Sequence, residues 1–499
     1  MKKLLILLLG AVVLFSCKDD KEEEMGGLPP VIHLEENRYY VEVGASQLIS
    51  PTYENTDNST LYVWTRDGKQ VGHEPTYTFK VSTAGTYYLK VTASNRFGSA
   101  SADIKMEVME AERDPEEGAY IPESTTDFSW EFPTTEINLA EGRTYKVKAY
   151  FIRNDNEATY TWTLNGAMVS PAATRAEKPV EYVLSGLSRG DYELALTMQN
   201  ETESHTQVFQ VHVYPPEGTY KRGTSASSQA MVNKIYEYMP APGHQVNGYR
   251  IVGDFGPDGM TMKQACDSVY AHFQRQWMVS LGAQGGYLIA GFDHSVENSG
   301  GDYDLCIKGN PYSYQNEPGI IWVSQDENGD GLPNDTWFEL AGSEYNTDNE
   351  ILEYAVTYYK PIEEKRPIYW VDNQGNHGVV PHMDYWNPHP SYWQDWVEGK
   401  QKTYFGSHLK NYVTYSGGVS DEPAFEWGYA DQSGTDYFNG KIGNSGYYKI
   451  SNAKTWDGKD ASLQYIDFVK VQTAQAAYTN NLGEVSTEVY YISDFHLEK

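Results

Sequence analysis

Short runs of alternating apolar and polar residues recur through the first half of the chain. Clear examples are residues 39–43, 60–66, 77–81 and 85–95, each followed by turn-forming residues such as Asp67-Gly68. Alternation with a period of two, interrupted by Gly, Asn and Asp, predicts short antiparallel strands. Several such strands around a single Trp64 predict a β-sandwich of the immunoglobulin-like or PKD-like kind over residues 31–110.

This pattern recurs further along the chain. The segment Tyr160–Gly166 repeats the pattern of Tyr62–Gly68, and Trp162 follows Trp64 after 98 residues. A repeat of this length indicates tandem modules, so we expect a second sandwich over residues 118–214. We expect the two modules to hold a third domain away from the membrane. The alternative is that one of them binds a ligand itself.

The remaining pattern predicts a larger β-domain over residues 229–499. Strands are expected at 285–292, 319–323, 353–361, 463–473 and 483–490. Helical periodicity is expected over 261–277, and a short helix over 230–238. The predicted fold class is therefore mainly β: two tandem Ig/PKD-like sandwiches, then a jelly-roll-like domain with one or two helices. Cys266 and Cys306 could form a disulfide or be two small buried residues.

The amino terminus carries the pattern of an export signal. Two lysines precede a 12-residue apolar stretch, residues 4–15, which is too short to span a bilayer. Leu14-Phe15-Ser16-Cys17 resembles a lipobox, which predicts a signal peptide over 1–16 and lipidation of Cys17. An ordinary secretory signal is the alternative. Residues 17–30 form an acidic tether, and such a run after the lipidated cysteine resembles the export signal of surface-exposed lipoproteins of Bacteroidetes.

Charge narrows the range of partners. The 499 residues have a formal net charge of −31. A nucleic-acid partner is excluded, because neutralising phosphates requires a basic face. The charge is compatible with binding divalent cations.

An acidic loop, residues 326–335, has the spacing of a calcium loop. Asp326, Asn328 and Asp330 occupy positions one, three and five, Gly331 follows at six and Leu332 at seven. Position twelve is Trp337 in place of the usual glutamate, so Asp335 or Glu339 is expected to supply the late carboxylate. We expect a structural calcium ion bound by these residues: Asp326, Asn328, Asp330, Leu332 and Asp335. A plain acidic turn is the alternative.

An aromatic-rich segment is the predicted ligand surface. Tyr and Trp are dense between residues 369 and 409, and Pro388 and Pro390 prevent a regular helix there. Flat aromatic faces suit sugar rings, a corrin ring or a nucleobase. The alternative is that they fill the core beneath a long loop. The residues expected to contact ligand are Tyr385, Trp386, His389, Tyr392, Trp393, Trp396 and Tyr404.

Motifs of common enzymes are missing from the sequence. It contains no Gly-x-Ser-x-Gly elbow, His-Glu-x-x-His pair or Walker loop. We therefore expect a binding protein, although a glycoside hydrolase would need only two facing carboxylates, which a sequence cannot pair. The competing classes are a glycan-binding lipoprotein of a polysaccharide-uptake system and an adhesin for proteins.

Several segments of the carboxyl-terminal half together resemble a large bacterial cell-surface domain. They are residues 317–319, 326–335, 337–345, 356–361, 466–471 and 483–488. With the lipobox and the sandwich modules, the chain is similar to surface lipoproteins encoded beside TonB-dependent corrinoid transporters, among them the cobalamin-binding BtuH group. The resemblance implies capture of vitamin B12 at the outer-membrane surface and its delivery to a TonB-dependent transporter. It assigns no contact residue.

Overall fold

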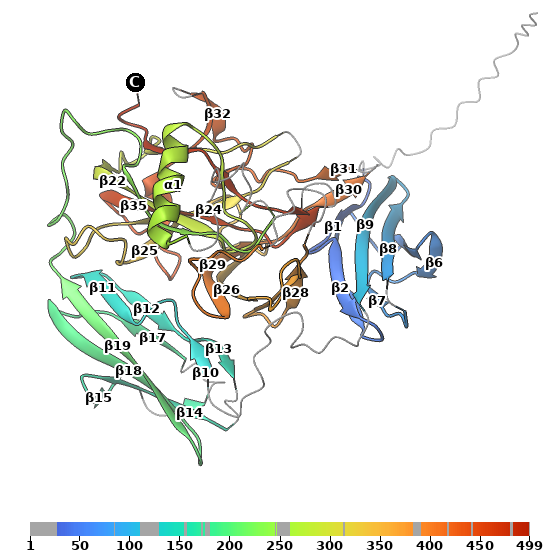
Figure 1. The fold of residues 1–499 in the computed structure, drawn as a ribbon, viewed down its shortest axis with the longest axis horizontal. Coiled ribbons are helices and arrows are strands. Elements are labelled where there is room, and N and C mark those ends of the chain that lie inside the picture. The colour runs from blue at the N-terminus through green and yellow to red at the C-terminus, as the bar shows by residue number, and fades with distance from the viewer. Residues whose placement is uncertain are drawn as a thin grey trace, which may run out of the picture.

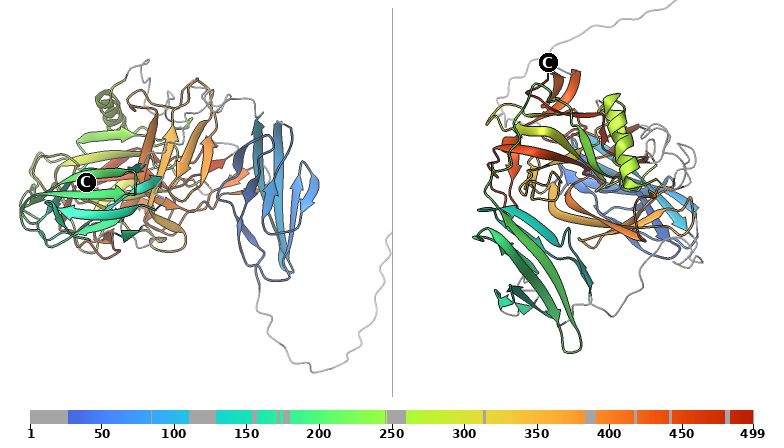
Figure 2. Two further views of the ribbon diagram at one scale, coloured as in Figure 1. Left: turned by 90° about the horizontal axis from the view of Figure 1, so that it is seen from below. Right: turned by 60° about the vertical axis from the view of Figure 1, so that its left-hand side comes forward.

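The computed structural model describes most of the chain (Figures 1 and 2). The described ranges are 27–83, 85–109, 129–153, 157–170, 173–174, 180–244, 246, 260–312, 315–382, 391–416, 419–440, 443–479 and 483–498. Cys17 and the predicted signal peptide lie outside them. The mainly-β fold class is confirmed. Among the described residues, no helix has the length and apolar character needed to cross a membrane.

The first module is a β-sandwich built around Trp64, which is fully buried. Its larger sheet has the order β2-β9-β8-β5-β6, and β2 runs parallel to β9. Phe79, Val91 and Met106 pack in the same core. The strands are β1 (Val31–His33), β2 (Arg38–Glu42), β3 (Gln47–Ile49), β4 (Thr52–Glu54), β5 (Leu61–Arg66), β6 (Lys69–Gly72), β7 (Tyr77–Phe79), β8 (Gly85–Asn95) and β9 (Gly98–Met109).

The second module repeats this topology around Trp162, which is 1% exposed. Its larger sheet has the order β11-β19-β18-β14-β15, again with a parallel first pair, β11 and β19. The strands are β10 (Ser129–Glu131), β11 (Glu136–Ala140), β12 (Tyr145–Lys148), β13 (Tyr150–Arg153), β14 (Thr159–Leu164), β15 (Ala167–Met168), β16 (Ala173–Thr174), β17 (Glu181–Leu184), β18 (Gly190–Gln199) and β19 (Ser204–Tyr214).

The repeat extends to the hairpin turns. Asp67-Gly68 and Asn165-Gly166 both have positive φ angles, 50° and 77° in the first turn and 49° and 76° in the second. Two consecutive positive φ angles define the type I′ turn, which favours Asp-Gly and Asn-Gly. The side chain of Asp67 accepts a hydrogen bond from an amide of the neighbouring strand, and so does that of Asn165. The sequence repeat is therefore a structural repeat.

The carboxyl-terminal domain is built from three larger antiparallel sheets, of order β20-β22-β35-β24-β25-β34, β32-β33-β23-β39 and β28-β27-β26-β29. The strands are β20 (Lys234–Met239), β21 (Val279–Ser280), β22 (Tyr287–Glu297), β23 (Leu305–Lys308), β24 (Gly319–Ser324), β25 (Trp337–Leu340), β26 (Glu350–Tyr359), β27 (Ile368–Asp372), β28 (His377–Val380), β29 (Gln401–Leu409), β30 (Thr414–Ser416), β31 (Val419–Asp421), β32 (Tyr437–Gly440), β33 (Gly443–Tyr448), β34 (Ala453–Lys454), β35 (Tyr465–Thr473), β36 (Tyr478–Thr479), β37 (Gly483–Glu484), β38 (Glu488–Val489) and β39 (Tyr491–Asp494).

One α-helix, α1 (Met262–Gln274), covers this core among the described residues. It begins at Thr261, whose side chain and that of Gln264 form a capping box. The helix predicted over 261–277 is thus confirmed, with shorter bounds. The helix predicted over 230–238 is wrong, because its alternating residues form strand β20, which pairs with β22. Both cysteines are free and buried, so they form no disulfide.

Both sandwiches pack against the carboxyl-terminal domain, which differs from the expected string of spacers (Figures 1 and 2). The side chain of Asn411 donates a hydrogen bond to the carbonyl of Glu35 in the first module, at 2.8 Å. In the second module, Lys146 and Lys148 both pair with Glu353. Glu353 lies where the register of β26 shifts and has a φ of 56°. A bulge of this kind re-aims a side chain, in this case toward the module.

Candidate functional site

Three of the residues predicted to bind ligand lie in the hydrophobic core. Tyr392, Trp393 and Tyr404 are 2%, 4% and 2% exposed and pack with Tyr358 and Trp370. A ring must present a free face to stack on a ligand. The prediction of an exposed platform is therefore wrong for these three residues, which fill the space beneath the sheet β28-β27-β26-β29.

The other four predicted contacts have different outcomes. Trp396 is half-buried, and its indole N–H donates to the carbonyl of Tyr238 at 2.8 Å. Tyr385, Trp386 and His389 lie outside the described residues, so their role stays a prediction.

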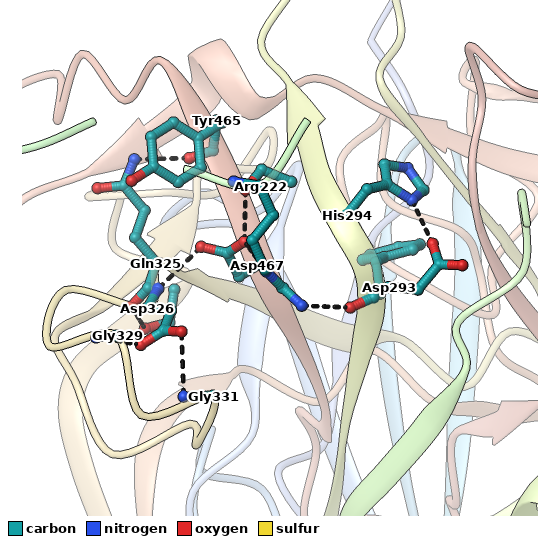
Figure 3. A network of polar contacts seen from close by, with 12 residues as sticks. Arg222, Asp293, His294, Gln325, Asp326, Gly329, Gly331, Tyr465 and Asp467 are labelled. Carbon is teal, nitrogen blue, oxygen red and sulfur yellow. Dashed lines mark hydrogen bonds and ion pairs between the residues drawn. The ribbon is translucent and has the colours of Figure 1, made fainter. Parts of the chain in front are cut away.

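The acidic loop joins β24 to β25 as a tight turn. The carboxylate of Asp326 accepts hydrogen bonds from the amides of Gly329, at 2.8 Å, and Gly331, at 3.1 Å (Figure 3). Asn328 accepts from the amide of Asp330, at 2.9 Å. Three of the predicted calcium ligands thus lie on one turn, whose geometry is also that of a hydrogen-bonded Asx turn.

Two further predicted ligands complete the loop. Leu332 lies near its tip, where its amide donates to Asp330 at 2.7 Å. Asp335 is 7% exposed, and neither carboxylate oxygen has a hydrogen bond of ordinary geometry. Burial raises the pKa of Asp335 to about 9, and the charges of Glu327 and Asp326 add to the shift, while the Glu327 amide offsets part of it. Asp326, Glu327 and Asp330 each accept a hydrogen bond of ordinary geometry, so Asp335 differs from the other loop carboxylates.

The base of the loop is fixed by a buried carboxylate on β35. Asp467 is fully buried and accepts hydrogen bonds from the Arg222 guanidinium at 2.9 Å, Ser295 at 2.6 Å and the Asp326 amide at 2.9 Å (Figure 3). Arg222 comes from the segment that links the second module to the carboxyl-terminal domain. This segment is therefore tied to the central sheet.

The same loop also binds the second module. Arg143 pairs with Glu327 and donates to the side chain of Gln325. The amide of Ala140 donates to Glu327 at 3.1 Å, and the side chain of Asn138 donates to the carbonyl of Asn334 at 3.1 Å. The loop therefore holds an interface between modules.

A second group of acidic residues lies at the opposite end of β24. Glu317, Asp431 and Glu488 come from three separate segments, yet one oxygen of each lies within 4.8 Å of the others. Glu317 precedes β24, Asp431 follows a backbone bridge between Ala430 and Gly319, and Glu488 begins β38. Asp431 and Glu488 are 3% and 4% exposed, and Glu317 is half-buried.

Backbone amides position these three carboxylates. Asp431 accepts hydrogen bonds from the amides of Asn310, at 2.6 Å, and Glu488, at 2.8 Å. Glu317 accepts from the amide of Ser486, at 2.9 Å. Burial raises the pKa of Glu317 to about 7 and moves the pKa values of Asp431 and Glu488 well above their usual range.

A fourth buried carboxylate, Glu422, lies near this group but is not among the three whose oxygens lie within 4.8 Å of one another. It is 2% exposed, and neither of its oxygens has a hydrogen-bond partner. Burial raises its pKa to about 9, with the charge of Glu317 as the next cause. We refer to Glu317, Glu422, Asp431 and Glu488 as the carboxylate cluster. The buried pair of His244 and Glu484 lies beside it, close enough for both charges to affect the pKa of Glu317.

Sequence reasoning missed the carboxylate cluster. Its members are separated by 57 to 105 residues, except for the nine between Glu422 and Asp431. No spacing motif can connect residues that only the sheet brings together. The one available signal was that Glu317 and Glu488 both belong to the segments that carry the family resemblance.

Comparison with known proteins identifies the first module. Residues 29–95 match the PKD-like domain family. No curated protein matches the chain. Among solved structures, the fibronectin(III)-like modules of Clostridium thermocellum CbhA match at 12% identity, covering 39% of this chain and all of theirs, with a TM-score of 0.16. The amino-terminal Ig domains of Dscam1 isoform 6.9 match at 13% identity, covering 38% and 47%, with a TM-score of 0.14.

These global scores are low, so the fold assignment depends on the strands and sheets described above. The PKD-like module and its structural repeat are sandwiches without a cofactor motif or metal-ligand spacing in their sequences. Both candidate cation-binding groups lie in the carboxyl-terminal domain.

Proposed function

We propose that this protein is a lipid-anchored, surface-exposed binding protein that captures a corrinoid outside the cell for a TonB-dependent transporter. The proposal depends on the resemblance of residues 229–499 to surface lipoproteins encoded beside corrinoid transporters, together with the lipobox ending at Cys17. The observation that supports it most is structural. The segments that carry the resemblance belong to β24, β25, β26, β35, β37 and β38 and the loops next to them.

These segments form one connected assembly. Strands β24, β25 and β35 are neighbours in the central sheet, and the amide of Ser486 binds Glu317 just before β24. A resemblance that includes three neighbouring strands of the central sheet and segments bound to their ends supports a shared domain, whereas scattered matches would indicate chance. The tandem sandwiches fit a binding protein, because modules of this kind commonly serve binding or support.

Equilibrium dialysis of the full chain against cyanocobalamin tests this function. We expect the visible absorbance of the corrin ring to accumulate in the protein compartment. Equal absorbance in both compartments at high protein concentration contradicts the corrinoid proposal. A glycan array run on the same sample tests the competing glycan-binding function, for which the aromatic-rich segment would serve equally.

The aromatic contact predicted at Trp386 can be tested by substitution. Trp386→Ala should weaken corrinoid binding by about 2 kcal/mol or more, because aromatic side chains dominate binding energies at recognition surfaces. Trp277 is 53% exposed at the end of α1 and serves as a matched control. Its replacement by alanine should leave the dissociation constant unchanged. Equal binding by wild type and Trp386→Ala would remove Trp386 from the site.

We also propose that the acidic loop binds calcium. Saturating calcium should raise the melting temperature. A free calcium concentration of 100 times the Kd adds about 2.7 kcal/mol to the free energy of unfolding. Asp335→Asn should reduce this increase, because it replaces a buried carboxyl group whose oxygens lack hydrogen-bond partners with a neutral amide, which is a weaker calcium ligand. Asp302→Asn, at an exposed carboxylate in another glycine-flanked turn, is the control. An unchanged calcium response in Asp335→Asn would contradict the loop site.

A further inference from the structure

Two buried carboxylates elsewhere in this protein have cationic partners from the chain itself. Asp467 pairs with Arg222, and Glu327 pairs with Arg143. This is the normal rule, since an unpaired buried charge is strongly unfavourable. Among the described residues, no ion pair joins a lysine or arginine to any member of the carboxylate cluster. The cluster therefore collects four acidic groups without a lysine or arginine partner.

Glu422 is the observation that points to a missing ligand. It is 2% exposed, and both of its oxygens lack a hydrogen-bond donor. Its backbone is held in place, because the side chain of Asn316 donates to the Glu422 carbonyl at 2.7 Å. Asn316 is adjacent to Glu317, so Glu422 is anchored beside the cluster.

The spacing of the cluster is that of one coordination sphere. Calcium binds oxygen at about 2.3–2.6 Å, so ligands on opposite sides of the ion lie about 4.8 Å apart. One oxygen each of Glu317, Asp431 and Glu488 falls within 4.8 Å of the others. The amides of Asn310 and Ser486 orient two of these carboxylates, as outer hydrogen bonds do around metal ligands.

We propose that Glu317, Glu422, Asp431 and Glu488 form a buried calcium site. Calcium is favoured over magnesium, because a cage of several carboxylates suits calcium, whereas magnesium usually keeps its waters and takes one or two carboxylates. The ion links the start of β24, the start of β38 and the segment that holds Glu422 and Asp431. It fixes the end of β24 where residues 317–319 and 483–488 meet.

This site is separate from the acidic loop. β24 begins beside the cluster and ends beside the loop, and its six residues, at about 3.3 Å each, separate the two by about 20 Å. The proposal is independent of the corrinoid function. The two calcium sites can be distinguished by substitution, since Asp335→Asn affects only the loop and Glu488→Gln only the cluster.

Calorimetric titration of the calcium-free full chain tests the proposal. Glu488→Gln should bind one calcium ion fewer per chain than wild type. Glu350 supplies the matched control: it is 7% exposed, neither of its oxygens has a hydrogen bond of ordinary geometry, and it lies beside Glu339 instead of the cluster. Glu350→Gln should bind as many ions as wild type. Equal numbers of bound ions in wild type and Glu488→Gln overturn the proposal and leave a cluster that shares protons only.

Glu422→Gln gives a second test if Glu488→Gln does not fold. Without calcium, it should melt at about the wild-type temperature, because glutamine replaces the buried carboxyl group with a neutral group of similar size. With calcium, it should melt below wild type and bind the cluster's ion at least about 10-fold more weakly. This change in the order of the two melting temperatures when calcium is added distinguishes a calcium ligand from a packing residue. Identical calcium responses of the two proteins, or equal affinity of the site for magnesium, overturn the proposal.

Discussion

Arg143→Ala should lower the stability of the interface between the second module and the carboxyl-terminal domain by about 3–5 kcal/mol. This is the usual effect of removing one partner from a buried ion pair. Glu327 is 4% exposed and would keep only the amide of Ala140 from the second module. The substitution also removes the bond to Gln325 and the contact of the guanidinium with the Phe338 ring, at 5.0 Å. The base of the acidic loop would lose its main attachment to the module.

The effect should be visible in both shape and unfolding. We expect an earlier, separate calorimetric transition and a larger radius of gyration in small-angle scattering. Arg189→Ala is the matched control, because Arg189 is an exposed arginine of the same module. A single transition at the wild-type temperature, with an unchanged radius of gyration, would show that Arg143 does not hold the interface.

A second set of contacts determines how far the module can move. The ring of Tyr150 meets that of Phe405 edge-on with centroids 5.1 Å apart, and Glu131 accepts a hydrogen bond from Thr403. Glu353 pairs with two lysines at the same face. Arg143→Ala should therefore loosen one end of the module. Adding Glu353→Ala to it should increase the radius of gyration further.

The sequence predicted the features that depend on local chemistry. The Asp67-Gly68 turn and its counterpart at residues 165–166 require left-handed backbone conformations, and that requirement is readable from the residue types alone. The helical periodicity over residues 261–277 likewise predicted the long helix. Lys234–Met239 was misread because a short apolar run does not distinguish a helix from a strand; its pairing with β22 decided the outcome.

The candidate sites were predictable only in part. The acidic loop is contiguous, so its oxygen-bearing residues could be recognised together, but its contacts with Arg143 could not. The carboxylate cluster depends entirely on sheet pairing, which brings Glu317, Asp431 and Glu488 together from distant segments. The prediction of an exposed aromatic surface was wrong for another reason. Tyr and Trp are amphipathic and serve equally well in a core or at a binding surface, and composition does not state which side faces solvent.

Trp393→Ala decides between those two uses of the aromatic segment. The side chain is 4% exposed, and its indole N–H donates to the carbonyl of Val397 at 3.3 Å. Removing a buried tryptophan leaves a cavity that lowers the free energy of unfolding by about 3–5 kcal/mol. In a domain of this size, the melting temperature should fall on the order of 10 °C. Differential scanning calorimetry measures this change directly.

The matched variant for this prediction is Trp393→Phe, which keeps an apolar ring in the same space and should lower the melting temperature much less. Because Trp393 is buried, Trp393→Phe should also retain the corrinoid affinity of wild type below its melting temperature, whereas Trp386→Ala should lose affinity without a comparable loss of stability. If Trp393→Ala instead kept its melting temperature and lost ligand, the residue would belong to the binding surface and not to the core. The contrast between Trp386 and Trp393 thus separates recognition from packing within one short stretch of the chain.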